Sequence, residues 1–441
     1  VAPSRWGRRG MRRHQTVLVA SAMRTFSVVR KVWRAFFRGM SLVGRGSLDH
    51  RGDLPKSAEV GAGARGHLAS TAPWASDSSA PVKLSRECRR SYENKVVLVS
   101  GAGGSIGSAL AREVLSCRPT HVILFELNEY ALYEIDRALA TVAGETGTRI
   151  TAVLGSVADP RTVRRVLERY GVHIVLHAAA YKHVPLVEAN PMAGLVNNVF
   201  GTQTLAEQAA HAGVERFILL STDKAVRPAN VMGASKRLAE RVVLDLSRRV
   251  GQGTAFSAVR FGNVLESSGS VVPLFREQLA RGGPLTVTHP LAERYFMTMQ
   301  QAVQMVLEAG TIAKGGEVFV FEMGAPVNVG ALARQMIEDA GLMVREDHRG
   351  EGGIAIVHTG LRAGEKLSEE LSLSDVRIPT DHPRIFAVQE PNLTEADTAA
   401  ALRALKEAFM ANNEKMAREV IARWVEPPPG AAPPAAIRRS S

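Results

Sequence analysis

The chain has 441 residues, of which 45% are hydrophobic and 22% charged, so it is long enough for one large α/β core with appendages or for two domains. Its two cysteines, Cys88 and Cys117, cannot build a disulfide framework, which fits a reducing compartment. The formal net charge of +12 would suit a nucleic-acid partner, but residues 1–95 hold 19 Lys and Arg against 6 Asp and Glu, so the remainder is close to neutral. We therefore expect a cytoplasmic protein that binds no nucleic acid.

The basic arm, residues 1–94, is expected to be disordered. Within it, residues 26–43 interleave aromatic and basic side chains, and two interpretations stay open for them. The stretch could lie on the inner face of an anionic membrane as an amphipathic helix, or it could be a solvated or untranslated extension. No run of 18 apolar residues occurs, so no transmembrane helix is predicted. Residues 391–441 are predicted to form a helix and a Pro-rich disordered tail.

From residue 95 onward, short β-branched runs alternate with longer amphipathic segments. The expected strands are 96–100, 121–126, 150–155, 173–179, 216–221 and 256–261. Continuous apolar strands separated by helices predict an α/β fold whose doubly wound parallel sheet is covered on both faces, as in Rossmann-type proteins. Residues 95–261 are thus predicted to be a dinucleotide-binding domain, and residues 262–390 mainly a smaller substrate-binding lobe.

The first expected strand runs directly into a glycine-rich turn that opens a helix. Small residues let the backbone approach a pyrophosphate, and the helix N-terminus supplies N–H donors. The candidate cofactor-binding residues are Gly101, Gly104, Ser105, Ile106 and Gly107. Glu126 ends the second strand, where it would bind a ribose 2′-hydroxyl and repel a 2′-phosphate. We expect NAD or NADP as cofactor, with NAD favoured, and no metal; the alternative is a tight turn that binds no ligand.

A polar segment at 221–224, STDK, ends the fifth strand. In the short-chain dehydrogenase/reductase class, a Ser or Thr at this place is followed by a Tyr-x-x-x-Lys motif. There the Lys holds the nicotinamide ribose and lowers the Tyr pKa, so that the phenolate can take a hydroxyl proton. This sequence resembles that arrangement, with Lys236 at the right spacing, but Met232 stands in place of the Tyr. A thioether cannot accept the proton.

Six longer segments, in order and without large gaps, carry a family resemblance. They are VSGAGGSIGSAL, HAAAYKHVPLVEANP, STDKAVRPANVMGASKR, VRFGNVLESSGSVVPLF, THPLAERYFMT and GLRAGEKLSEEL. Over about residues 95–390 the chain resembles the bacterial capsular and O-antigen polysaccharide-biosynthesis family of UDP-N-acetylglucosamine 4,6-dehydratases, which are extended short-chain dehydrogenases/reductases. The large membrane-associated members typically have Met at the position of Met232 as well, so the resemblance implies a subfamily feature and not an inactive enzyme.

The resemblance implies an internal redox reaction joined to an elimination. C4 of the sugar gives hydride to the cofactor, water leaves across C5–C6, and the hydride returns to C6. By resemblance Asp223 and Lys224 are the acid/base pair, Ser221 and Thr222 hydrogen-bond the sugar near C4, and Lys236 holds the cofactor. The alternative for Asp223 and Lys224 is a surface turn.

Other positions match binding residues of the family. They are Lys182, His183 and Glu188 near the nicotinamide or sugar, and Asn263, Ser270, Arg294 and Arg362 at the uridine diphosphate. An arginine suits a diphosphate because its guanidinium binds two oxygens at once. The alternatives are a satisfied core histidine for His183 and surface salt bridges for Arg294 and Arg362.

Some positions depart from the family pattern. Glu266 replaces a Gly, Ala363 replaces a Pro, and Ser156 stands where related dehydrogenases often have an adenine-binding Asp. The basic arm stands where the large relatives have four membrane-spanning helices.

The resemblance thus implies a lyase that converts UDP-N-acetylglucosamine to a UDP-4-keto-6-deoxy sugar for surface polysaccharide biosynthesis. Two alternatives stay open: a UDP-sugar 4-epimerase of the same fold, which needs no elimination acid, and a non-catalytic nicotinamide-binding protein. We expect a UDP-sugar as the partner molecule and a homo-oligomer as the assembly.

Overall fold

The structure, a computed structural model, describes residues 83–251, 253–345, 353–373, 376–389 and 393–425. Residues 406–413, the end of helix α13 (Glu395–Met410) and a turn, group with residues outside these ranges, so the fold is described for residues 83–405 and 414–425. Residues 26–43, predicted to touch a membrane, and the Pro-rich tail from residue 426 lie outside the described residues. Among the helices described, none is long and apolar enough to cross a bilayer.

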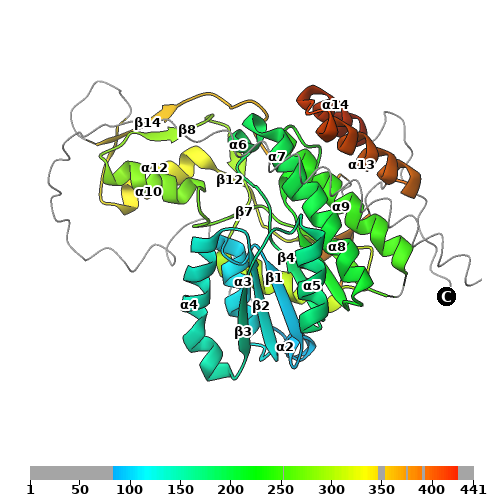
Figure 1. The fold of residues 1–441 in the computed structure, drawn as a ribbon. Coiled ribbons are helices and arrows are strands. Elements are labelled where there is room, and N and C mark those ends of the chain that lie inside the picture. The colour runs from blue at the N-terminus through cyan, green and yellow to red at the C-terminus, as the bar shows by residue number, and fades with distance from the viewer. Residues whose placement is uncertain (1–82, 252, 346–352, 374–375, 390–392, 426–441) are drawn as a thin grey trace, which may run out of the picture. The chain divides into compact units, whose positions relative to one another are not determined.

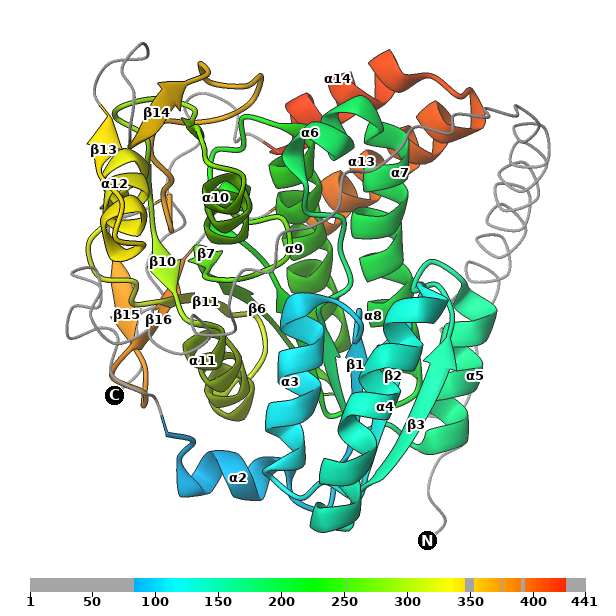
Figure 2. The same cartoon turned by 90° about the vertical axis from the view of Figure 1, so that its left-hand side faces the viewer.

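The core is a large sheet whose strands, within the described residues, follow the order β15-β16-β11-β6-β5-β4-β1-β2-β3 (Figures 1 and 2). The strands are β1 (Val96–Ser100), β2 (His121–Glu126), β3 (Arg149–Leu154), β4 (Ile174–His177), β5 (Arg216–Leu220), β6 (Ala255–Arg260), β11 (Val318–Phe321), β15 (Arg377–Pro379) and β16 (Ile385–Val388). Pairing is parallel from β3 through to β11, and β16 and β15 add an antiparallel edge. The predicted doubly wound parallel sheet is confirmed.

Helices cover both faces of the sheet (Figure 2). One face carries α2 (Arg86–Tyr92), α3 (Ser105–Leu115), α4 (Glu129–Thr146) and α11 (Met299–Ile312). The other carries α5 (Pro160–Tyr170), α8 (Gly201–His211) and α9 (Val231–Val250), and α6 (Val184–Ala189), α7 (Pro191–Leu195) and a π-helical turn, Val196–Phe200, lead from β4 into α8. Because helices cover both faces, β2 and β4 are buried almost throughout, and all their residues except His121, Glu126 and His177 are apolar.

At β1 the order in which the chain adds strands to the sheet reverses. This strand pairs with β2 on one side and with β4 on the other, and Ser100 at its end aligns with Phe125 and His177. The carboxyl ends of the three strands are therefore level. Ligands of doubly wound sheets bind beyond such a point, because the connecting helices diverge there to opposite faces.

The smaller lobe combines two helices with short strands (Figure 1). The helices are α10 (Val271–Ala280) and α12 (Val329–Asp339). The strands pair as β7 (Asn263–Val264) with β10 (Phe296–Met297), β9 (Glu293–Arg294) with β12 (Val327–Asn328), and β14 (Ile354–His358) with both β8 (Leu285–Val287) and β13 (Val344–Arg345). Phe275, Leu332 and Ile337 pack in its core. Strands β11 and β16 lie between residues 262 and 390 yet belong to the large sheet, so the two predicted domains interleave.

A helix precedes the first strand, inside the arm that the sequence analysis expects to be disordered. In and beside α2, Leu84, Cys88 and Tyr92 are buried, and the Tyr92 hydroxyl donates to the carbonyl oxygen of Leu307 at 3.1 Å. The fold therefore begins before the predicted boundary at residue 95. The sequence pattern does not predict this helix, because the helix has only 7 residues and four of them are charged.

We predict that Tyr92→Ala lowers the free energy of unfolding by about 3–5 kcal/mol, the usual cost of removing a fully buried aromatic ring. Urea denaturation measures this change. Arg90→Ala, at an exposed position of the same helix, is the control and should change it by less than about 0.5 kcal/mol. Equal values for the two variants would mean that α2 does not unfold with the core.

Candidate active site

The glycine-rich turn after β1 has no room for side chains. Gly101 has a φ of +68°, and a Cβ on it would lie 2.7 Å from the backbone of Ala179. A Cβ on Gly107 would lie 2.0 Å from the carbonyl oxygen of Gly101. Glycine at both positions lets the turn fold back against the start of α3. The first N–H groups of that helix are thereby presented at the carboxyl edge of β1.

Two adjoining cavities lie along this turn. One, of about 500 Å³, borders Ser105, Ile106 and Gly107, and the other, of about 610 Å³, borders Glu126 and Ser156. Both are lined by the residues Gly101, Gly104 and His183. Gly104 is the N-cap of α3 and makes no side-chain capping bond, so the positive end of the helix dipole is open to a phosphate.

Glu126 braces the turn from the end of β2. Its Oε2 accepts from the N–H of Gly103 at 3.0 Å, and its Oε1 accepts from the N–H groups of Leu127 and Asn128 at 2.8 and 2.9 Å. The carboxylate therefore fixes the turn and keeps a negative charge beside the larger cavity. The close-packed glycines, the open helix N-terminus and this acid together fit a nicotinamide dinucleotide.

The glycine constraint predicts loss of cofactor from Gly107→Ala, because its Cβ would push the turn away from α3. We expect the purified variant to release several-fold less dinucleotide on denaturation than the parent protein. The matched control is Gly144→Ala in α4, where a Cβ meets nothing within 4 Å. A folded Gly107→Ala protein that retains as much dinucleotide as Gly144→Ala would contradict the assignment of the turn.

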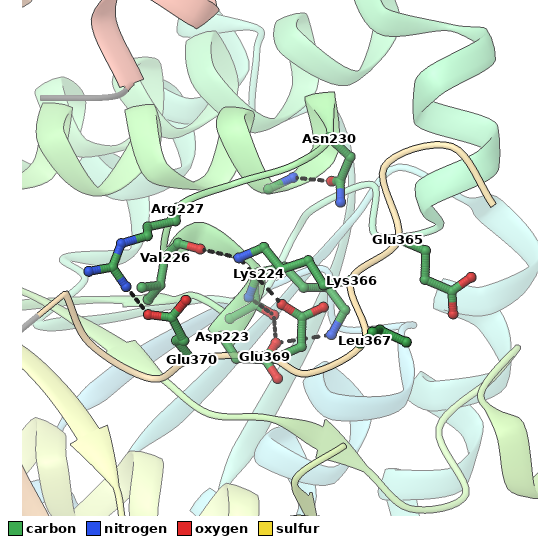
Figure 3. A network of polar contacts seen from close by, with 12 residues as sticks. Asp223, Lys224, Val226, Arg227, Asn230, Glu365, Lys366, Leu367, Glu369 and Glu370 are labelled. Carbon is green, nitrogen blue, oxygen red and sulfur yellow. Dashed lines mark hydrogen bonds and ion pairs between the residues drawn. The ribbon is translucent and has the colours of Figure 1, made fainter. Parts of the chain in front are cut away.

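The predicted acid/base pair follows the end of β5 at Leu220, and Figure 3 shows the two side chains with their polar neighbours. The Lys224 ammonium donates to Asp223 Oδ1 at 3.0 Å and to Asn263 Oδ1 at 3.1 Å. The Thr222 hydroxyl donates to the same Asp223 oxygen at 2.9 Å. Asp223 is fully buried, and its Oδ2 has no hydrogen-bond partner among the described residues. An unpaired buried carboxylate oxygen is costly, which is typical of a site that completes its hydrogen bonds with a ligand.

Lys366 and Glu369 lie beside this pair (Figure 3), and they belong to the segment that follows β14 in the chain. Lys366 Nζ donates to the carbonyl oxygen of Val226 at 2.9 Å and lies 3.9 Å from Glu369 Oε2. Burial raises the pKa of Glu369, an effect that the Lys224 ammonium opposes. Two amines and two carboxyls thus gather here. Sequence reasoning missed Lys366 and Glu369, although both lie in the quoted segment GLRAGEKLSEEL.

Ser221 is bonded to the protein interior. Its hydroxyl donates to Glu240 Oε1 at 2.6 Å. Glu240 is fully buried and accepts from Arg260 at 2.8 and 2.7 Å and from Arg237 at 3.2 Å. Burial raises the pKa of Glu240, but the Arg260 and Arg237 guanidinium groups outweigh burial and bring the pKa to about 2. The Ser221 proton is therefore held by an ionised carboxylate.

Helix α9 brings Met232 and Lys236 to the same strand end. Lys236 Nζ donates to the carbonyl oxygen of Leu220, the last residue of β5, at 2.6 Å, and burial lowers the Lys236 pKa to about 8. Met232 is buried, and its carbonyl oxygen accepts from the Ser235 hydroxyl at 2.6 Å. Its thioether offers apolar contact and no proton acceptor.

The segment after β4 carries three of the predicted binding positions. Lys182 and His183 line the cavity at the glycine turn, and burial lowers the pKa of both side chains. A Cβ on Gly269 would lie 2.3 Å from the His183 ring, so the smaller lobe packs directly on this histidine. Glu188, farther along, binds the backbone N–H of Val231.

The four predicted diphosphate ligands have different surroundings. Arg294 is buried, and its guanidinium donates to the carbonyl oxygens of residues 293, 366 and 367 and to the Glu365 carboxylate. Arg362 is exposed, while the Ser270 hydroxyl is buried with no hydrogen-bond partner in the described part of the chain. Asn263 accepts from Lys224, so it belongs to the acid/base cluster. Arg294 in this arrangement holds the segment that carries Lys366.

The sheet is doubly wound, its first strand ends in a glycine turn of the dinucleotide-binding type, and Lys236 binds the polar end of β5. This is the architecture of the extended short-chain dehydrogenases/reductases. The chain belongs to the family described as "Polysaccharide biosynthesis protein", which matches residues 97–390. The family resemblance inferred from the sequence is confirmed.

The individual relatives are named for different activities. Capsular polysaccharide biosynthesis protein CapD of Staphylococcus aureus is 46% identical over 282 residues, which are 64% of this chain and 46% of that protein. The chain thus spans about half the length of this relative. A UDP-N-acetylglucosamine 4,6-dehydratase (inverting) of Campylobacter jejuni is 30% identical over 64% of this chain and 79% of its own. A UDP-glucose 4-epimerase of Rickettsia rickettsii is 31% identical over 67% of this chain and 82% of its own.

A solved structure agrees with the fold. The X-ray structure of Pen from Bacillus thuringiensis is 32% identical, with a TM-score of 0.61, and the match covers 69% of this chain and 92% of that one.

Proposed function

We propose that the chain is a nicotinamide-dependent 4,6-dehydratase that acts on UDP-N-acetylglucosamine. The observation that carries the proposal is the Asp223–Lys224 pair, with its buried carboxylate oxygen left without a partner in the described residues, at the carboxyl edge of a dinucleotide-type sheet. Elimination of water needs an acid and a base held at one place. The relative named as a 4,6-dehydratase supports the substrate, and the family supports a role in surface polysaccharide synthesis.

The pair supplies the proton transfers of the elimination. A base must remove the C5 proton, and an acid must protonate the departing C6 hydroxyl. A nicotinamide dinucleotide, when bound, supplies the hydride acceptor and donor. Lys224 acts as the base: its amine, when deprotonated, takes the C5 proton and gives a proton back to C5 after water has left. Asp223, whose Oδ1 lies 3.0 Å from Lys224 Nζ, acts as the acid at the C6 hydroxyl.

The C4 hydroxyl proton also needs an acceptor, since Met232 cannot take it. The Thr222 hydroxyl lies 2.9 Å from Asp223 Oδ1, so it can receive the C4 proton while it passes its own proton to that carboxylate. Asp223 then holds the proton that leaves with the water molecule. The protons balance over a turnover, because the proton released at C4 is consumed at the C6 hydroxyl and the proton removed from C5 is replaced there.

NAD is the proposed form of the cofactor. The Glu126 carboxylate lines the cavity where the adenosine ribose is expected, and within the described ranges it accepts only backbone N–H donors. A 2′-phosphate there would meet this negative charge, and the described residues that line the cavity include no Arg or Lys. The proposed assembly, a homo-oligomer, and the proposed cytoplasmic location rest on the sequence analysis alone.

Product analysis tests the proposal. The purified protein is incubated with UDP-N-acetylglucosamine in deuterium oxide, and the product is followed by NMR. We expect a 4-keto-6-deoxy sugar with deuterium at C5, because the C5 proton leaves and is replaced from solvent. Accumulation of the 4-epimer without deuterium would favour the epimerase, an alternative that the 31% identical relative supports.

We predict that Asp223→Asn and Lys224→Met each lower kcat by roughly 10²–10⁴, the usual effect of removing a positioned proton-transfer group. Binding of the sugar nucleotide, measured by calorimetry, should persist because the predicted diphosphate ligands Ser270 and Arg362 are not part of the pair. Lys314→Met, which removes an exposed charge, is the control and should leave kcat unchanged. Near-normal rates in both pair variants would remove these residues from the mechanism.

We predict that Met232→Leu keeps kcat within about tenfold, a barrier change of no more than about 1.4 kcal/mol, because the buried side chain serves as apolar filler. Steady-state kinetics measures this. A parent protein that binds cofactor and substrate without conversion, together with an active Met232→Tyr variant, would show instead that the native site is degenerate.

A further inference from the structure

A C-terminal helix reaches the segment that lines the dinucleotide cavity. In α14 (Glu414–Val425), Arg418 donates from Nη1 to the Glu188 carboxylate at 2.9 Å and from Nη2 to the Glu188 carbonyl oxygen at 2.7 Å. Glu414, one turn earlier, accepts from the same guanidinium at 3.1 Å and holds it in place. Arg418 thus binds both the main chain and the side chain of Glu188, which fixes the end of α6.

Glu188 also binds the first turn of the active-site helix, α9. Its second carboxylate oxygen accepts from the backbone N–H of Val231, the first residue of α9. Asn230 caps the same turn by accepting from Gly233 N–H at 2.8 Å. The first N–H groups of a helix have no partner inside the helix, so these two side chains determine where α9 begins.

The first turn of α9 rests directly on the acid/base segment. A Cβ on Gly233 would lie 2.2 Å from the carbonyl oxygen of Lys224, so the two backbones are in close contact. Met232, at the position of the class Tyr, is in the same turn. If this turn shifts, it displaces the main chain of Lys224, and the position of the Lys224 ammonium group changes with it.

Helix α14, which carries Arg418, is packed against and hydrogen-bonded to α9. It buries Ala417, Val420 and Ile421 and packs on α9. At its other end, Arg241 of α9 donates to the carbonyl oxygens of Trp424 and Val425 at 2.9 and 3.0 Å. The helix is thus tied to the active-site helix at its C-terminus and to Glu188 near its N-terminus.

We propose that Arg418 is a positioning residue for the active site, acting through Glu188 on the first turn of α9 and hence on Lys224. The inference rests on the proposed function for its kinetic consequence, but its structural consequence does not. Both oxygens of the Glu188 carboxylate are bound by protein groups, so Glu188 acts here as the link and not as a sugar ligand.

The test compares Arg418→Met with Lys415→Met in the full-length protein. Lys415 is exposed on the same helix, so its variant loses the same charge without touching Glu188. Hydrogen–deuterium exchange is measured on peptides that cover residues 226–238. We expect faster exchange at the start of α9 in Arg418→Met only. We also expect kcat to fall roughly 10–100-fold with KM changed less than about threefold, as for a catalytic group moved by a fraction of an ångström.

Two further variants keep the test decisive. Arg418→Lys retains one donor toward Glu188 and should recover part of the lost kcat. Glu188→Gln keeps the side-chain shape but can accept at only one oxygen, so it should reproduce the faster exchange even if Arg418→Met does not fold. Exchange and kcat in Arg418→Met equal to those in Lys415→Met would overturn the proposal. A parent protein that does not convert UDP-N-acetylglucosamine would refute the proposed function, and the exchange measurement would still decide the role of Arg418.

Discussion

The active site depends on one buried carboxylate, that of Glu240. It lies on α9 and binds Arg260 at the end of β6, Arg237 on its own helix and Ser221 just beyond β5. None of the charged partners is more than 2% exposed. Removing one member of such a cluster leaves an uncompensated buried charge, which typically costs about 3–5 kcal/mol. The cluster therefore holds the active-site helix and two strand ends in one arrangement.

The arrangement has a second fixed point at the other end of the same helix segment. Glu240 lies two helical turns after Met232, a rise of about 12 Å, and Glu188 holds the turn that contains Met232. Between these points α9 carries Lys236, whose ammonium is bonded to the last carbonyl of β5. A helix held at its first turn and at Glu240 can keep Lys236 and the backbone of Lys224 in register without help from the substrate.

The sequence predicted those features that have a local pattern. Apolar runs identified the parallel strands, and the glycine spacing identified the turn at β1, because both depend on neighbouring residues. Ion pairs between residues far apart in the sequence leave no local pattern. Glu240 pairs with Arg260, and Glu188 pairs with Arg418 across 230 positions. For the same reason, Arg294 was expected at a diphosphate, whereas it is bonded to nearby carbonyl oxygens. Helix α2 was not predicted, because it is buried by contacts with α11, which lies far along the chain.

These contacts give a physical reason why α9 can lack a tyrosine. On the proposed mechanism, the hydroxyl that faces C4 is that of Thr222, and its proton acceptor is Asp223, so both groups belong to the end of β5. The helix then needs to supply only Lys236 and a surface of the right shape, which Met232 provides. Three consecutive residues, 222–224, carry the proposed proton transfers, and such a site tolerates little displacement because each group is positioned by its neighbours. The fixed points at Glu240 and Glu188 meet that requirement, since they hold the helix that packs against these residues.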